Sequence, residues 1–304
     1  FQLSYDPDTE ILVTVGGSEA IDLGFRALLN PGDEVILPEP NYVCYRPLIT
    51  LAQGLVKPVD TTGSAFLPTV GELQKNYGAK TKAVVFSYPS NPTGIVPTAA
   101  QQQAWAEWAV SNDVWVLSDE IYADLTFTQQ PFQSMASFAG MRERTLLVTG
   151  VSKAFAMTGW RIGIAAGPRE LIGLMCKIHQ YNMLCAPIMS QYAAIEAYRQ
   201  GEAVIAPMRD SYRQRRNFFV SALRDMGLDL VEPAGAFYVF PSIRRTGLSC
   251  HDFAMGLLKS HAVAVVPGTA FGACGEGYIR CCYATDFAKL KAAAAAMKAF
   301  VAGV

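Results

Sequence analysis

The sequence has few of the residues and patterns that are typical of metal-binding, nucleic-acid-binding or membrane proteins. It holds only three histidines, His179, His251 and His261, and none has neighbours at metal-ligand spacing, so no metal site is expected. The formal net charge is −1, which argues against nucleic acid or an anionic membrane surface as the main partner. No apolar run reaches the roughly 18 residues that a membrane span needs.

Cysteine is present but is not arranged for disulfides or metal. The seven cysteines are odd in number and scattered, and no C-x-x-C pair occurs. This usage predicts small core thiols in a reducing compartment, and hence a cytoplasmic protein. The adjacent Cys281 and Cys282 should point to opposite faces if their segment is a strand. The chain starts at Phe1 without a basic or cleavable apolar leader, so we expect no signal peptide and read the start as mid-protein sequence.

Seven short apolar runs rich in β-branched residues recur in the first part of the chain. Most are separated by stretches with helical spacing, such as residues 18–29 and 98–112. This alternation predicts an α/β fold with a mostly parallel, seven-stranded sheet flanked by helices. The runs are ILVTV (11–15), EVILP (34–38), LVKPV (55–59), AVVFSYP (83–89), VWVLSDE (114–120), TLLVTG (145–150) and RIGIAAG (161–167).

The second part of the chain has a different pattern. A long helical region over about 169–226 is expected to be interrupted near Pro187 and Pro207. Short apolar runs and two further helices follow, which predict a smaller C-terminal α+β domain. The expected domains are a large one over 1–205, with an interdomain helix from about 182, and a small one over 206–304.

Polar residues directly follow several predicted strands, where ligands bind in parallel sheets. In VTVGGSEA (13–20), Gly17, Ser18 and the amide of Glu19 can present free N–H groups to an anion at a helix start. An ordinary glycine turn with Ser18 as helix N-cap explains the same residues. Neither G-x-G-x-x-G nor G-x-x-x-x-G-K-[ST] occurs, so no motif indicates a dinucleotide or a nucleoside triphosphate.

Three further stretches carry polar groups that need partners. SYPSNPTGIV (87–96) is a turn that does not itself require Asn91, whose amide both donates and accepts. In VWVLSDEIYADL (114–125), Asp119 ends an apolar strand and needs a cationic or N–H partner. Lys153 lies among small and apolar residues in VSKAFAMTGWRIG (151–163), where its charge must be paired or lost.

Together these stretches resemble the class I/II aminotransferases, fold-type-I enzymes that use pyridoxal 5′-phosphate (PLP). The resemblance implies exchange of an amino group between an L-amino acid of the aspartate or aromatic type and a 2-oxo acid such as 2-oxoglutarate. It also implies a homodimer. The matching motifs, in family order from residue 11 to about 285, are VTVGGSEA, PEPNYVCY, YPSNPTG, SDEIYADL, SKAFAMTGWRIG, PAGAFY and YIRCCYA.

The resemblance implies roles around the cofactor ring. Lys153 would form the Schiff base and, once substrate releases it, act as the general base. Asp119 would pair with the pyridine nitrogen, and Asn91 and Tyr122 would hydrogen-bond the phenolic oxygen. Tyr42 would stack on the ring face. These residue types suit the chemistry, because PLP is an electron sink for a carbanion and lysine is a nucleophile toward aldehydes.

The resemblance also implies a phosphate site. Gly17, Ser18 and Arg161 would hold the phosphate. Gly150 stands where many relatives have a phosphate-binding serine, so Ser152 is expected to compensate.

For the substrate, the resemblance implies that Arg280 takes the α-carboxylate bidentately, assisted by Asn91. Arg26 or Lys57 could in principle meet a distal carboxylate, but surface solvation is the better explanation for each. Family members carry a further segment before the first motif, which closes over substrate and reaches the neighbouring subunit's site. The chain is therefore expected to lack the family's N-terminal segment. The sequence does not name the preferred amino donor.

Two other functions are compatible with the same motifs. A different fold-type-I reaction, such as a C–S β-lyase, would use the same lysine and cofactor site. An aminotransferase-like effector domain of a transcriptional regulator would retain the fold, but the complete set of catalytic motifs and the absence of a basic linker favour an enzyme.

Overall fold

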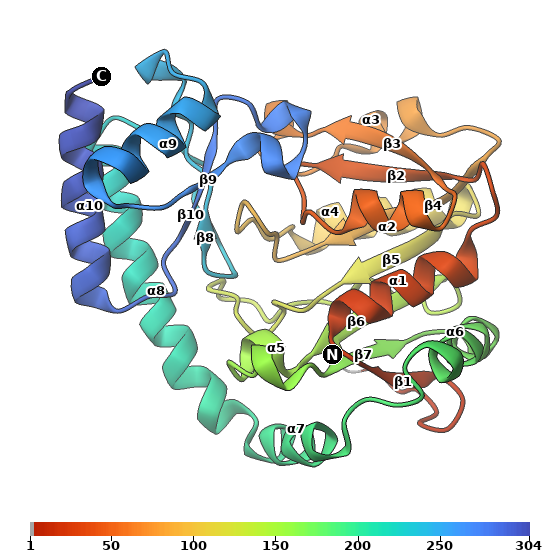
Figure 1. The fold of residues 1–304 in the computed structure, drawn as a ribbon. Helices are drawn as coiled ribbons and strands as arrows, with labels where there is room; N and C mark the ends of the chain where they lie inside the picture. The colour runs from red at the N-terminus through yellow and green to blue at the C-terminus, as the bar shows by residue number, and fades with distance from the viewer. Residues whose placement is uncertain (1–2) are drawn as a thin grey trace.

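The computed structural model describes residues 3–304 and is organised around a seven-stranded sheet (Figure 1). The strand order is β1-β7-β6-β5-β4-β2-β3. β7 is antiparallel to both of its neighbours and the other pairs are parallel, which confirms the expected mostly parallel sheet. The strands are β1 (Ile11–Thr14), β2 (Glu34–Glu39), β3 (Leu55–Asp60), β4 (Thr81–Ser87), β5 (Trp115–Asp119), β6 (Thr145–Gly150) and β7 (Gly163–Ala166).

Helices cover both faces of this sheet and enclose two apolar cores. Alternate residues of β4 divide between them: Ala83 and Val85 belong to the core under α1, α2 and α6, whereas Val84 and Phe86 belong to the core with α3 and α4. This alternation follows from the two-residue period of a strand. The helices are α1 (Gly17–Leu28), α2 (Tyr45–Leu51), α3 (Val70–Asn76), α4 (Ala99–Ser111) and α6 (Arg169–Asn182).

The sequence marks the starts of α3 and α4 with capping boxes. The Thr69 side chain accepts from the backbone N–H of Glu72, and the Glu72 carboxylate accepts from the backbone N–H of Thr69. Thr98 and Gln101 form the same reciprocal pair at α4. Each pair satisfies helix-end donors that would otherwise lack partners, so these two helices begin at defined residues.

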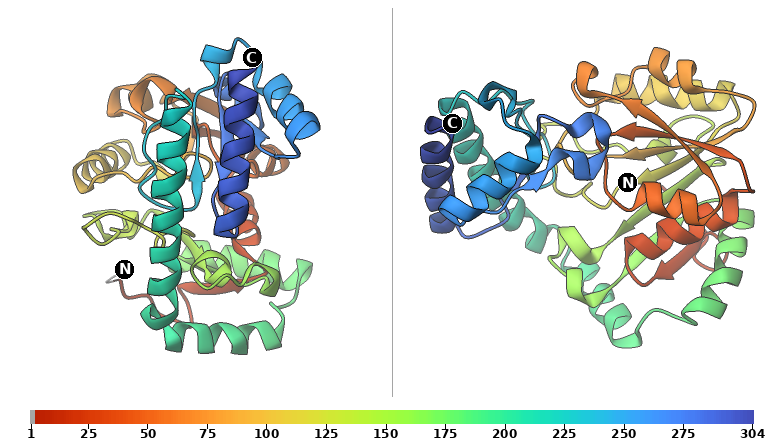
Figure 2. Two further views of the ribbon diagram at one scale, coloured as in Figure 1. Left: turned by 90° about the vertical axis from the view of Figure 1, so that its left-hand side faces the viewer. Right: turned by 45° about the horizontal axis from the view of Figure 1, so that its top comes forward.

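A second unit follows, in which three helices pack on a small sheet of order β8-β10-β9. This confirms the expected smaller α+β unit. α8 runs from α7 toward this unit and lies beside α10 (Figure 2). The proposed boundary at 205/206 falls inside α8 and stays a prediction. The elements are α7 (Ile188–Gln200), α8 (Glu202–Asp225), β8 (Tyr238–Val239), α9 (Cys250–His261), β9 (Val266–Pro267), β10 (Ile279–Cys282) and α10 (Phe287–Ala302).

The expected interruption at Pro207 is wrong. α7 begins after Pro187, as expected, but the next break is at Gly201, which has a φ of 49°. Pro207 lies inside the 24-residue α8, close to its start. A proline there removes one backbone donor, and the remaining turns of a long packed helix compensate for that loss. Within residues 3–304, none of the helices combines the length and the apolar character that crossing a membrane requires.

The cysteines follow the expectation only in part. Cys281 is buried and its neighbour Cys282 is exposed, so the two do point to opposite faces of β10. Cys250 is also buried. The expected core role is wrong for Cys176, Cys185 and Cys282, which are exposed.

Candidate active site

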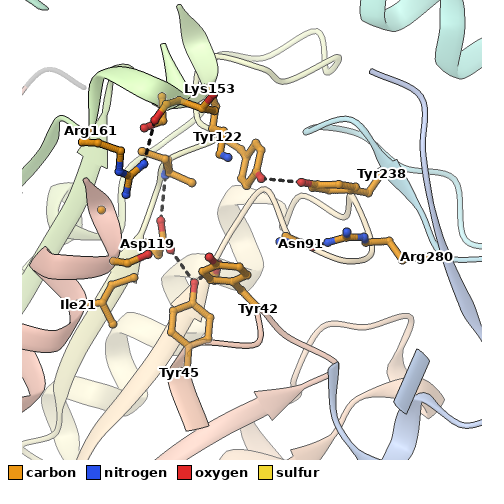
Figure 3. Close-up of a pocket in the computed structure, with 16 residues that line it drawn as sticks. Ile21, Tyr42, Tyr45, Asn91, Asp119, Tyr122, Lys153, Arg161, Tyr238 and Arg280 are labelled. Atoms are coloured by element: carbon orange, nitrogen blue, oxygen red, sulfur yellow. Dashed lines mark hydrogen bonds between the residues drawn. The ribbon is translucent and has the colours of Figure 1, made fainter. Parts of the chain in front are cut away.

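Polar side chains from distant parts of the chain meet at the carboxyl ends of β4, β5 and β6, around a cavity of about 340 Å³ (Figure 3). Every residue expected to touch cofactor or substrate lines it, with the exception of Glu19. The roles of these residues stay predictions. The lining consists of Gly17, Ser18, Ile21, Tyr42, Tyr45, Ser87, Asn91, Asp119, Ile121, Tyr122, Ser152, Lys153, Thr158, Arg161, Tyr238 and Arg280.

Lys153 lies in α5 (Val151–Ala154), the single turn that follows β6. Burial lowers the pKa of its ammonium, and the charges of Arg161 and Arg280 lower it further, whereas the charge of Asp119 opposes this change. Its Nζ lies 5.8 Å from the centroid of the Tyr122 ring. This lowering makes the neutral amine, the nucleophilic form of lysine, easier to reach than in a lysine exposed to solvent.

Asp119 ends β5 and is only 5% exposed. Its Oδ2 accepts from the Tyr45 hydroxyl at 2.6 Å, and its Oδ1 accepts from the Ile121 N–H at 3.2 Å. Burial raises the pKa of this carboxyl, while the two hydrogen bonds and the charge of Lys153 lower it. The Tyr45 hydroxyl also lies 2.7 Å from Ser87 Oγ. Because Tyr45 has one proton, Ser87 donates to it when Tyr45 donates to Asp119.

Arg280 is held by groups from three other segments. Its Nη1 donates to Asn91 Oδ1 at 2.8 Å, and Figure 3 shows the two side chains facing each other. The guanidinium lies 4.5 Å from the ring centroid of Tyr238 and 4.9 Å from that of Phe271. The Tyr238 hydroxyl is in turn 3.1 Å from that of Tyr122. These contacts fix the plane of the Arg280 fork at the cavity wall, as bidentate recognition of a carboxylate requires.

An anion-binding arrangement lies at the start of α1. Gly16, with a φ of 82°, is the N-cap, so the alternative in which Ser18 caps the helix is wrong. The Arg161 guanidinium packs directly on this turn, because a Cβ on Gly16 would lie 2.3 Å from Arg161 Nη2. Arg161 Nη1 also donates to the Thr158 carbonyl at 2.9 Å. The N–H groups of Gly17 and Ser18 thus lie beside a guanidinium, which suits a phosphate.

Glu19 does not act as expected. Its N–H donates to the Gly16 carbonyl at 3.2 Å and so is not free for an anion. Its carboxylate does not line the cavity. Instead, Oε2 accepts from the Val15 N–H at 2.5 Å, and Oε1 lies 2.9 Å from His179 Nδ1. The expectation of a free Glu19 donor is wrong, because the turn that precedes the helix uses that group itself.

The absence of a serine at Gly150 has a steric cause. A Cβ at this position would lie 2.7 Å from the Ile162 carbonyl oxygen and 3.0 Å from the Gly163 Cα. β6 and β7 therefore approach too closely for any side chain there. Ser152 is buried and lines the cavity, so its hydroxyl is available to the same site.

The sequence alone did not predict several of the lining residues. It did predict the three cationic ones, Lys153, Arg161 and Arg280. Tyr45 and Tyr238 lie within the motifs PEPNYVCY and PAGAFY, so their place in these motifs could have indicated that they belong to the site. Arg26 and Lys57 do not reach the cavity: Arg26 pairs with Asp22 at 2.8 Å and Lys57 with Glu34 at 3.7 Å. In the part of the chain from residue 3 onward, no group of three or more His, Cys, Asp or Glu residues could hold a metal ion.

The chain is similar to known aminotransferases. The family model "Aminotransferase class I and II" matches residues 1–297. The chain is 50% identical over 302 residues to the putative aminotransferase YugH of Bacillus subtilis, covering 99% of this chain and 78% of that protein. It is 43% identical over 293 residues to an aspartate aminotransferase of Pyrococcus abyssi, covering 95% and 75%.

A solved structure shows the same fold. The aromatic aminotransferase of Pyrococcus horikoshii superposes with a TM-score of 0.96 at 41% identity, covering 99% of this chain and 81% of that one. The family model matches almost the whole chain, and the solved structure has the same fold, so the family of the chain is clear. The chain belongs to the class I and II aminotransferases and is an aminotransferase of fold type I.

Proposed function

We propose that this aminotransferase uses PLP to move the α-amino group of an aspartate-type or aromatic L-amino acid to a 2-oxo acid such as 2-oxoglutarate. The observation that carries the proposal is the meeting of Lys153, Asp119 and Arg280 in one cavity. Relatives named aspartate aminotransferase and aromatic aminotransferase support the two donor classes.

The residues present fit PLP by their chemistry. Lys153 offers an amine of lowered pKa to an aldehyde, and Asp119 offers a buried carboxylate to a pyridine nitrogen. The helix start at Gly17 and Ser18, together with Arg161, offers N–H donors and a positive charge to a phosphate. Bound PLP supplies an electron sink for the carbanion that forms when an amino acid loses its α-proton.

The protein's own groups position the reactants and move protons. Arg280 binds the substrate carboxylate through its fork, with the plane of the fork set by Asn91. The amine of Lys153 would take the proton from the substrate α-carbon, and the resulting ammonium would deliver a proton back within the same half of the exchange, so that the amine is regenerated before the second half begins. With PLP bound, Asp119 would hold a proton on the pyridine nitrogen, and Tyr122 and Asn91 would orient the phenolic oxygen.

The decisive experiment is a panel of amino donors, including aspartate, tyrosine and phenylalanine, assayed with 2-oxoglutarate and PLP. The expected result is glutamate formed in equal amount to the oxo acid of the donor. Release of pyruvate and ammonia from a cysteine-type donor would instead support a C–S β-lyase. PLP binding without turnover of any donor would support the effector-domain alternative.

The homodimer and the cytoplasmic location expected from the sequence are part of this proposal. Large apolar side chains are exposed in the segment from the end of α6 through α7: Tyr181 (85%), Leu184 (77%), Met189 (77%) and Tyr192 (69%). Exposed apolar side chains gathered in one stretch are typical of a protein interface. A second copy of the chain is the partner that we propose for this segment.

A further inference from the structure

Glu19 and His179 form a partly buried pair on the side of α1 that faces away from the cavity. The Glu19 side chain is 13% exposed and that of His179 is 6% exposed. Both carboxylate oxygens are engaged, one by the Val15 N–H and the other by the His179 ring. A carboxylate this well satisfied is fixed in position, and it joins the end of β1, the start of α1 and the last turn of α6.

The turn that this carboxylate holds is the support for Arg161. Val15 and Gly16 form the turn, and the guanidinium of Arg161 rests on Gly16 in the space of a missing side chain. Beneath the turn, Gly163 of β7 is packed so closely that a Cβ there would lie 2.4 Å from the Gly16 carbonyl carbon. A shift of the turn would therefore move both the N–H donors of α1 and the cation that lies beside them.

We infer that Glu19 and His179 are positioning residues for the phosphate end of the cofactor site. They do not touch the phosphate; they hold the Val15–Gly16 turn so that its neighbouring N–H groups and Arg161 converge on one anion. This inference rests on the proposed function, since the phosphate is that of the proposed cofactor. It predicts a specific loss of phosphate recognition when the pair is broken, with the rest of the cavity intact.

The test compares the dissociation constants of PLP and of pyridoxal, which lacks the phosphate, by absorbance and by quenching of protein fluorescence. In Glu19→Ala, PLP should bind about tenfold more weakly, because a charge-assisted hydrogen bond is lost. Pyridoxal should bind as it does to the unaltered chain. His179→Ala should show the same selective loss, and His179→Asn should restore it in part, because the Asn amide places a donor near the position of Nδ1.

Asp22→Ala is the matched control, since Asp22 is a partly buried acid one turn further along α1 that pairs with the exposed Arg26. It should leave both constants unchanged. Equal weakening of PLP and pyridoxal, or unchanged binding in both His179→Ala and Glu19→Ala, would overturn the inference. Should the unaltered chain fail to prefer PLP over pyridoxal, the proposed function would fail instead, so the two failures are distinguishable.

Discussion

The hydroxyl of Tyr45 donates a hydrogen bond of 2.6 Å to Oδ2 of Asp119, across 74 positions of sequence. Tyr45 is completely buried, and Ser87 holds its hydroxyl from the other side at 2.7 Å. Burial raises the pKa of this carboxyl, and the hydrogen bond from Tyr45 opposes part of that rise. Tyr45 therefore helps to keep Asp119 ionised, which is the form that can hold a proton on a pyridine nitrogen.

The first prediction tests this relationship. Tyr45→Phe should lower kcat about tenfold, the size expected for loss of a hydrogen bond to a charged group. Asp119→Asn should lower it about 10²-fold or more, because the carboxylate itself is lost. Steady-state rates at saturating cofactor provide the measurement. Tyr88→Phe is the control, since the Tyr88 hydroxyl faces the Phe66 carbonyl and not Asp119. Equal effects of the two Tyr→Phe changes would contradict the assignment.

The second prediction concerns the lysine. Borohydride reduction of the protein with PLP should fix the cofactor covalently to Lys153, because the structure lowers the pKa of this amine inside the cavity. Peptide mapping by mass spectrometry locates the label. Lys153→Ala should remain unlabelled, whereas Lys57→Ala, which alters a surface lysine paired with Glu34, should be labelled as before. A label on any other lysine would refute the role of Lys153.

The third prediction concerns substrate recognition. Arg280→Lys should raise the KM for amino and oxo acids about tenfold or more, because an ammonium cannot replace a bidentate fork. Cofactor absorbance should stay unchanged. Arg244→Lys is a matched control, because Arg244 also lies over an aromatic ring, that of Tyr278, at 4.9 Å but does not line the cavity. Parallel losses of cofactor and substrate binding would point to a folding defect.

The fourth prediction concerns stability. Burial raises the pKa of Glu120 from 4.5 to about 7, although Ser118, Ser134 and the Met135 N–H donate to it. The folded chain therefore keeps this proton up to about pH 7, whereas the unfolded chain releases it above about pH 4.5. The free energy of unfolding should fall as the pH rises through that window, by about 3 kcal/mol from this group.

Denaturant unfolding at pH 4.5 and at pH 7 measures this slope. Glu120→Gln should remove the part of this pH dependence that comes from Glu120, since a neutral amide does not titrate. Glu107→Gln, which alters a solvent-exposed acid of α4, should retain the full slope. The same pH dependence in both variants would show that Glu120 is not the group responsible.

The fifth prediction concerns assembly. Sedimentation should give twice the 33.0 kDa mass of the chain, because the apolar side chains of the 181–192 segment are exposed in a single copy. Met189→Asp should shift the protein toward the monomer, as a charge is costly in an apolar interface. Leu55→Asp, at an exposed apolar position outside the segment, should leave the mass unchanged. Dissociation by both changes, or by neither, would contradict the proposed interface.

The sequence predicted the elements whose signals are local. Each of the seven apolar runs became a strand of the large sheet, because a buried strand needs continuous apolar side chains. The positions of Asp119, Asn91 and Lys153 followed from motifs at strand ends, where parallel topology brings ligand-binding residues together. A motif and a strand end are both readable without knowledge of the three-dimensional structure.

Features that depend on distant partners could not be predicted in this way. The direction of the Glu19 side chain is set by His179, 160 positions further along. The partnership of Tyr45 with Asp119 depends on how α2 packs beside β5, which no local pattern encodes. The expected break at Pro207 does not occur for a related reason, since the packing that supports the rest of α8 outweighs the low helix propensity of one residue.

The hydrogen bond between Arg280 and Asn91 joins residues 189 positions apart, and this separation has a consequence for the order of folding. A contact of such long range forms only after the intervening chain has largely condensed, since closing so large a loop early costs entropy without compensating contacts. The sheet that carries Lys153 and Asp119 is built from residues 11–166, so it can assemble before Arg280 is in place. During refolding, capture of the cofactor is therefore expected to precede recognition of the amino acid.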